Sequence, residues 1–131
     1  MEIKMNESTN NRPQGKRLVD APAVFIDIED HVQQLQSETG WQKNDRNAIT
    51  VFKSAGTTVV ITALHKNAML DDLDTEGLIL VQVLRGSVFF TGDENESRKI
   101  AGKQMMAIHP GPKLQVTAEE DSVLLLTVIS N

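Results

Sequence analysis

From Asn47 to the end of the chain, short apolar segments alternate with turn-forming residues at close intervals. Many short segments separated by Gly, Pro, Asn and Asp are typical of an all-β sandwich or barrel. The length of 131 residues fits a single domain, and the sequence contains no long internal repeat. We therefore expect an all-β fold with strands over residues 48–53, 57–65, 77–86, 87–92, 97–102, 103–111, 113–118 and 122–130.

The segment from Gly77 to Arg85 is apolar on both faces, unlike a strand with one face in water. Its alternate residues form one aliphatic row and a second row interrupted by a glutamine, namely Ile79, Val81 and Val83, and Leu78, Leu80, Gln82 and Leu84. Residues 122–129 have the same two-sided character. We expect the second face to be covered by a second sheet, by residues 18–38 or by a partner subunit.

The N-terminal part divides into a polar tail over residues 1–17, predicted to be disordered, and an arm with one short helix over residues 18–46. Within 27–38, three apolar residues have the spacing of one helical stripe, Asp27 is a plausible N-cap, and Gly40 fits a helix stop. The stripe consists of Ile28, Val32 and Leu35. We expect Trp41, the only tryptophan, to clamp this segment onto the β-domain at residues 47–131.

Composition excludes several classes of function. Residues 18–131 carry nine basic and sixteen acidic groups, a net −7, so nucleic-acid binding is not expected. The tail over residues 1–17 has four basic and two acidic groups, a net +2. There is no Cys for a disulfide, a thiolate metal site or a cysteine nucleophile. No apolar run approaches the roughly 20 residues that a membrane span needs, and no secretory signal is recognisable, so we expect a cytoplasmic protein.

Two motifs carry a specific resemblance. In the first, G-x5-H-x-H-x3-E-x6-G, the spacing anchored on Gly86 places Asn67 at the leading Gly. In the second, G-x5-P-x-G-x2-H-x3-N, the spacing anchored on Gly111 places His109 at the Pro and Lys103 at the leading Gly. Gly102, beside Lys103, suggests that this turn is kept with a shift of one residue. On these grounds residues 47–129 resemble a single cupin domain, a small double-stranded, jelly-roll-like β-barrel.

The resemblance also shows what this chain lacks. The motif positions that hold the metal in cupins are occupied by Leu73, Thr75, Ile79 and Leu114, and the final Asn is replaced by Ala118. A divalent metal needs imidazole, carboxylate or water ligands, which three aliphatic side chains and one hydroxyl do not supply. The resemblance therefore implies no metal and no other cofactor. It implies instead an apolar interior lined by these four residues, and a homodimer, because cupins of this kind often form dimers.

Two of the three histidines are possible functional residues. His65 ends a predicted strand and could point into the barrel, where Asp72 or Asp74 would orient its ring as in a general base. His109 precedes Pro110, which suits a turn residue or a ligand contact. His31 lies on the predicted helix and is expected at the surface.

Other residues have weaker functional patterns. The residues from Asp72 to Gly77 imitate the start of an EF-hand loop, but Val83 stands at the twelfth position, so a solvated turn is the better reading. Three methionines suit core packing and could also line an apolar cavity, namely Met69, Met105 and Met106. Gln82 would need hydrogen-bond partners if buried.

These patterns leave three functions open. The first is a non-enzymatic module that binds a small apolar or amphipathic molecule in the barrel, since such sites are mostly hydrophobic. The second is a metal-independent isomerase-type enzyme that uses His65 and a carboxylate. The third is a filled barrel that acts only as an assembly or regulatory partner.

Overall fold

The computed structural model describes residues 22–71, 73, 77–92, 96–111 and 113–130. In this part of the chain, two helices, α1 (Ile28–Ser37) and α2 (Thr39–Lys43), precede the strands. The strands are β1 (Arg46–Ser54), β2 (Thr57–Leu64), β3 (Met69–Leu70), β4 (Leu78–Arg85), β5 (Ser87–Thr91), β6 (Ser97–Ala101), β7 (Met105–Ile108), β8 (Gln115–Ala118) and β9 (Ser122–Ile129). The all-β prediction is confirmed, and each expected segment contains a strand. The two-residue β3 was not expected. The tail at residues 1–17 lies outside the described residues.

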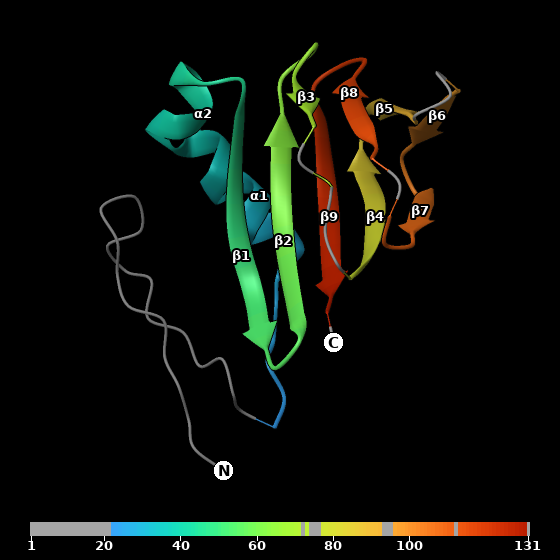
Figure 1. Ribbon diagram of the computed structural model, residues 1–131. Helices are drawn as coiled ribbons and strands as arrows, with labels where there is room; N and C mark the ends of the chain where they lie inside the picture. The colour runs from blue at the N-terminus through green and yellow to red at the C-terminus, as the bar shows by residue number, and fades with distance from the viewer. Residues whose placement is uncertain (1–21, 72, 74–76, 93–95, 112, 131) are drawn as a thin grey trace.

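The described strands form two antiparallel sheets. The larger has the order β1-β2-β9-β4-β7 and the smaller the order β3-β8-β5-β6. The last strand, β9, lies between β2 and β4 in the middle of the larger sheet (Figure 1). Strands distant in sequence are therefore neighbours, because β9, from the end of the chain, pairs with both β2 and β4.

An inner core fills the space between the sheets, and strands of both sheets contribute to it. Its buried members are Leu64, Ala68, Leu70, Leu73, Ile79, Val81, Val83, Val88, Phe90, Ile100, Ile108, Val116, Ala118 and Leu124. This core contains the first row of β4, as expected from its aliphatic character.

An outer core joins the helices to the opposite face of the larger sheet. Its buried members are Val32, Leu35, Ile49, Val51, Ile61, Ala63 and Val123, with Ile26, Trp41, Val59, Leu84 and Leu125 packed against them. Figure 1 shows α1 and α2 against this face on the side of β1 and β2. The N-terminal segment thus covers part of the second face of β4, through Leu84, while Leu78 and Leu80 stay half-buried.

Helix α1 follows its predicted start, because the Asp27 side chain accepts a hydrogen bond from the Asp30 backbone N–H at 3.1 Å. Its end differs from the prediction that Gly40 stops the helix. The helix ends at Ser37, Glu38 is extended, and Gly40 lies inside α2. The Asn47 side chain explains the break, because its Nδ2 donates to Leu35 O and to Glu38 Oε1, each at 2.9 Å. One amide from β1 thus satisfies acceptors at the helix end.

Candidate ligand-binding site

The backbone tests the alignment of the two motifs independently of their side chains. Asn67, Gly86, Lys103 and Gly111 have φ values of 74°, 83°, 73° and 118°. These are the positions aligned with the leading and final Gly of the first motif and with both Gly of the second. Positive φ is rare for residues other than Gly, so its occurrence at Asn67 and Lys103, both aligned with a Gly, supports the alignment. Lys103 itself takes the left-handed conformation, so the expected shift to Gly102 is wrong.

The described motif positions that would hold a metal lie in the inner core or against it. Ile79, on β4, and Leu73, after β3, are both buried in the inner core, and Leu114, before β8, is half-buried against it. The fourth position, Thr75, lies outside the described residues. The three described side chains offer no donor atom, so a metal does not fit here. Among the described residues, no group of His, Asp and Glu could hold a metal elsewhere.

On the inner face of the larger sheet, the side chains of β4 are buried, whereas several side chains of β2 and β9 are half-buried. Thr58 and Val60 share the face of Leu64, an inner-core residue, because side chains alternate along β2. They pair with Val128 and Leu126 of β9. All four are half-buried, whereas their neighbours on β4 are fully buried. The smaller sheet thus covers the β4 side and leaves part of β2 and β9 reachable by solvent.

We call this region the opening. It consists of four half-buried inward residues of β2 and β9, namely Thr58, Val60, Leu126 and Val128. None of these four residues is among the ligand contacts predicted from the sequence. The alternation in 57–65 shows which residues share a face, but only strand pairing shows that this face is the inner one.

Solved structures of other proteins share this arrangement. A cupin superfamily protein from Desulfitobacterium hafniense aligns with a TM-score of 0.63 at 10% identity, covering 67% of this chain and 80% of that one. The chain has the cupin fold. No protein-family model and no curated protein matches the sequence.

Two further structural neighbours differ in the share of the chain that they match. A conserved protein of unknown function from Streptococcus pyogenes is 18% identical over 96% of both chains, with a TM-score of 0.66. The cupin domain of an XRE family transcriptional regulator from Enterobacter cloacae is 14% identical over 67% of this chain and 99% of that one, with a TM-score of 0.58. Identities this low establish the shared fold, and fold alone does not assign function.

His65 lies outside the interior of this cupin fold, contrary to the expectation that it points inward. It is in phase with Ile61 and Ala63, which belong to the outer core. Its ring stacks on Trp41 with centroids 3.4 Å apart, and its Nε2 lies 2.7 Å from the Trp41 carbonyl oxygen. A carbonyl only accepts, so Nε2 carries the hydrogen. Trp41 therefore clamps α2 onto the barrel, as predicted.

Among the described residues, a carboxylate close to the His65 ring is that of Asp121. Asp121 Oδ1 lies 3.9 Å from His65 Nδ1 and accepts the Lys66 backbone N–H at 2.8 Å. The candidates Asp72 and Asp74 lie outside the described residues. Catalysis by His65 stays a prediction, but its ring is held at the helix–barrel junction rather than beside the opening.

Beside this junction, the Arg46 guanidinium hydrogen bonds to Asp45 and lowers the pKa of that carboxyl. The resulting stabilisation is present above the usual pKa of aspartate. It is lost as the pH falls through the lowered value. Both partners lie at the surface, so the contribution of this pair is small.

Three other candidates fall outside the opening. His109 is exposed directly after β7. Met69 and Met105 are exposed on β3 and β7. Among the described residues, neither α1 nor α2 meets the length and hydropathy of a membrane-spanning helix.

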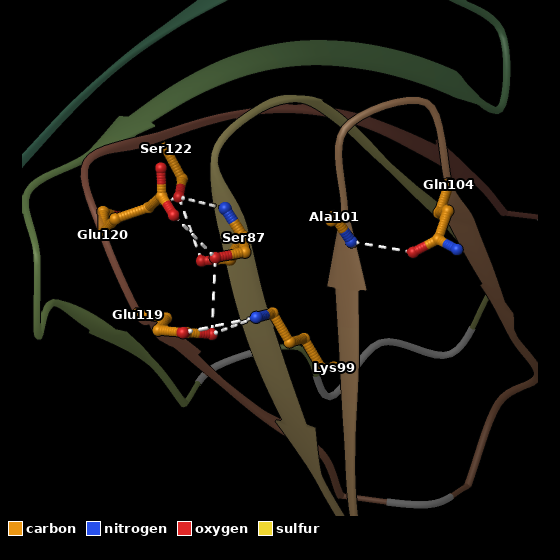
Figure 2. A network of polar contacts seen from close by, with 7 residues as sticks. All are labelled: Ser87, Lys99, Ala101, Gln104, Glu119, Glu120 and Ser122. Carbon is orange, nitrogen blue, oxygen red and sulfur yellow. Dashed lines mark hydrogen bonds and ion pairs between the residues drawn. The ribbon is translucent and has the colours of Figure 1, made fainter.

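A polar network built around two buried serines joins two turns of the barrel (Figure 2). Ser122 Oγ accepts the Ser87 backbone N–H and lies within hydrogen-bond distance of the Ser87 and Glu120 carbonyl oxygens. Ser87 Oγ lies 3.1 Å from Glu120 Oε2, and the adjacent Glu119 pairs with Lys99. The network satisfies buried hydroxyls and fixes the β8–β9 turn against β5. No local sequence pattern indicates the Ser87–Ser122 contact, because the two residues are 35 positions apart.

Proposed function

We propose that this protein is a metal-free, non-enzymatic module that binds a small apolar or amphipathic molecule at the opening. The observation that carries the proposal is the half-buried state of Val60, Leu126 and Val128, whose side chains face inward. Ligand sites are mostly apolar with a few polar groups, and Thr58 and Thr62 provide hydroxyls on the same face.

The chemistry of the interior favours binding over catalysis. General acid–base catalysis needs a titratable group within hydrogen-bond reach of the substrate. Among the described residues, the buried polar side chains are Thr62, Ser87 and Ser122, and none of them titrates near neutral pH. The isomerase alternative rests on His65, which stacks on Trp41 in the outer layer.

A filled barrel with a regulatory or assembly role is the second candidate. Val81, Val83, Val88, Val116 and Leu124 have no exposed surface, which favours a closely packed centre. The neighbour from Enterobacter cloacae is the cupin domain of a transcriptional regulator, and a similar role here is a proposal. The two candidates differ at the opening, where only the first requires a bound molecule.

Binding of the neutral fluorescent probe N-phenyl-1-naphthylamine tests the proposal. We expect saturable binding to the wild type. We expect Val60→Thr to weaken it by about threefold, because a hydroxyl replaces apolar contact area without a change of shape. Val59→Thr is the matched control, since Val59 is the next residue on β2 and packs against the outer core. Absence of saturable binding, or equal weakening by the two substitutions, would contradict the proposal.

A further inference from the structure

We infer that the opening selects an amphipathic carboxylate, with its apolar body on Val60, Leu126 and Val128 and its carboxylate beside Lys53. This inference rests on the proposed function and adds the chemical class of the ligand. It is argued from the register of β1, β2 and β9 and from the charges of the described residues.

The register places a cation at the rim of the apolar surface. Lys53 pairs with Thr58 across β1 and β2, and Thr58 pairs with Val128 across β2 and β9. Directly opposed residues of an antiparallel pair project to the same face. One row of side chains across the sheet therefore begins at the exposed Lys53 and continues through Thr58. It then passes the half-buried Val128 and ends at the buried Ile79.

The β-bulge in β1 is what turns Lys53 to this face. The register shifts between Thr50 and Phe52, so that Phe52 pairs with Val59 and Lys53 with Thr58. Without the extra residue, strict alternation from Thr50 would place Lys53 on the opposite face, over the outer core. The apolar outer core gives a lysine no favourable partner, whereas the inner face borders solvent here.

Lys53 is also available to an anion. Within the described part of the chain, Arg46, Arg85 and Lys99 pair with Asp45, Glu29 and Glu119, whereas Lys53 has no such partner. An ammonium contributes three donors, and the adjacent Thr58 hydroxyl adds another. A carboxylate at the rim would accept from both while its chain covers the half-buried residues.

The acidic loop after β3 favours a different class of ligand, one with a positive charge. Asp71 is exposed at its start, and three further acidic residues of the loop, Asp72, Asp74 and Glu76, lie outside the described residues. A ligand selected by this loop would be cationic. We favour Lys53 as the group that selects the ligand, because it pairs directly with Thr58 of the opening. Asp71 instead follows β3, which belongs to the smaller sheet.

Three probes of equal chain length distinguish these cases, namely octanoate, 1-octanol and octylamine. Titrations followed by the methyl resonances of Val60, Leu126 and Val128 report on the opening itself. We expect octanoate to bind more tightly than octanol, and Lys53→Gln to weaken octanoate by about threefold without affecting octanol. Lys43→Gln is the matched control, because it removes the same charge from α2, on the other side of the sheet.

Each outcome is decisive. Preference for octanoate that depends on Lys53 supports the inference. Equal binding of octanoate and octanol, or an equal effect of Lys43→Gln, overturns it but leaves the proposed function standing. Tighter binding of octylamine assigns selectivity to acidic groups and also overturns it. If none of the three shifts these resonances and the neutral naphthylamine also fails to bind, the proposed function itself is wrong.

Discussion

At the residue scale, positive φ occurs at positions aligned with a motif Gly even where this chain has another residue. Lys103 and Asn67 have positive φ although neither is Gly, and both align with a Gly of the cupin motifs. Asn tolerates this conformation comparatively well, whereas Lys carries the full steric cost of its Cβ. The turn before β7 is therefore strained in this chain.

Replacement of Lys103 by Gly should relieve that strain. We expect Lys103→Gly to raise the free energy of unfolding by about 1 kcal/mol, because Gly adopts positive φ without a Cβ clash. Chemical denaturation measures the change. Lys103→Ala removes the same long side chain but retains the Cβ, so an equal gain from both substitutions would rule out strain as the cause.

Gly86 is needed for close packing as well as for its φ of 83°. A Cβ there would lie 2.3 Å from Ser122 Oγ, a member of the polar network in Figure 2, and 2.6 Å from Asp121 O. We expect Gly86→Ala to lower the free energy of unfolding by about 3 kcal/mol or more. At Gly102 the nearest such atom is 3.8 Å away, so thermal denaturation of Gly102→Ala should show a much smaller loss.

At the scale of elements, one side chain decides where a helix ends. The apolar stripe of α1 ends at Leu35, and the helix breaks at Glu38, where Asn47 Nδ2 of β1 donates to Leu35 O and Glu38 Oε1. Gly40 then permits close approach, since a Cβ there would lie 3.2 Å from Asn47 Oδ1. The α1–α2 pair is thus docked to the sheet through polar contacts as well as through the outer core.

Removal of that amide should loosen the helices. We expect Asn47→Ala to lower the free energy of unfolding by about 1–2 kcal/mol, because it removes two side-chain hydrogen bonds in a half-buried setting. Amide hydrogen exchange should show the loss first in α1 and α2. Asn44→Ala, an exposed position that ends α2, is the control and should change little. A matching effect at both positions would contradict this role of Asn47.

At the scale of the whole molecule, the helices cover only one side of the outer face of the larger sheet. On the other side Leu78 and Leu80 are half-buried, while Met105 and Ile129 are exposed. We propose that a second copy covers this surface in a homodimer. Both copies carry a net charge of −5, so contact through an uncharged apolar area avoids repulsion between them.

The solution mass tests the homodimer. Sedimentation equilibrium at micromolar concentration should give twice the 14.5 kDa of one chain. Met105→Glu should shift the protein toward monomer, because association would bury an unpaired carboxylate. Met69→Glu, an exposed position on β3 of the smaller sheet, should leave the mass unchanged. A wild-type mass near 14.5 kDa would exclude the dimer.

Much of the fold was predictable because its signals are local. The strand segments follow from alternation and turn residues, and the start of α1 follows from Asp27 and its apolar stripe. The site was predictable only in part. The motif spacing identified Leu73, Ile79 and Leu114, which lie in or against the inner core, and their role as ligand contacts stays a prediction. The opening at Val60 and Leu126 was missed.

The sequence by itself determined the all-β class, the strand segments and the apolar character of the aligned metal positions, because each depends on residue type and short spacing. Only the tertiary structure decided which face of β2 is inner, and hence that Val60 borders the opening while His65 stacks on Trp41. The same holds for the bulge that turns Lys53 inward and for the Ser87–Ser122 contact. These features depend on which distant strands pair and in what register, and alternation alone defines two faces without distinguishing them.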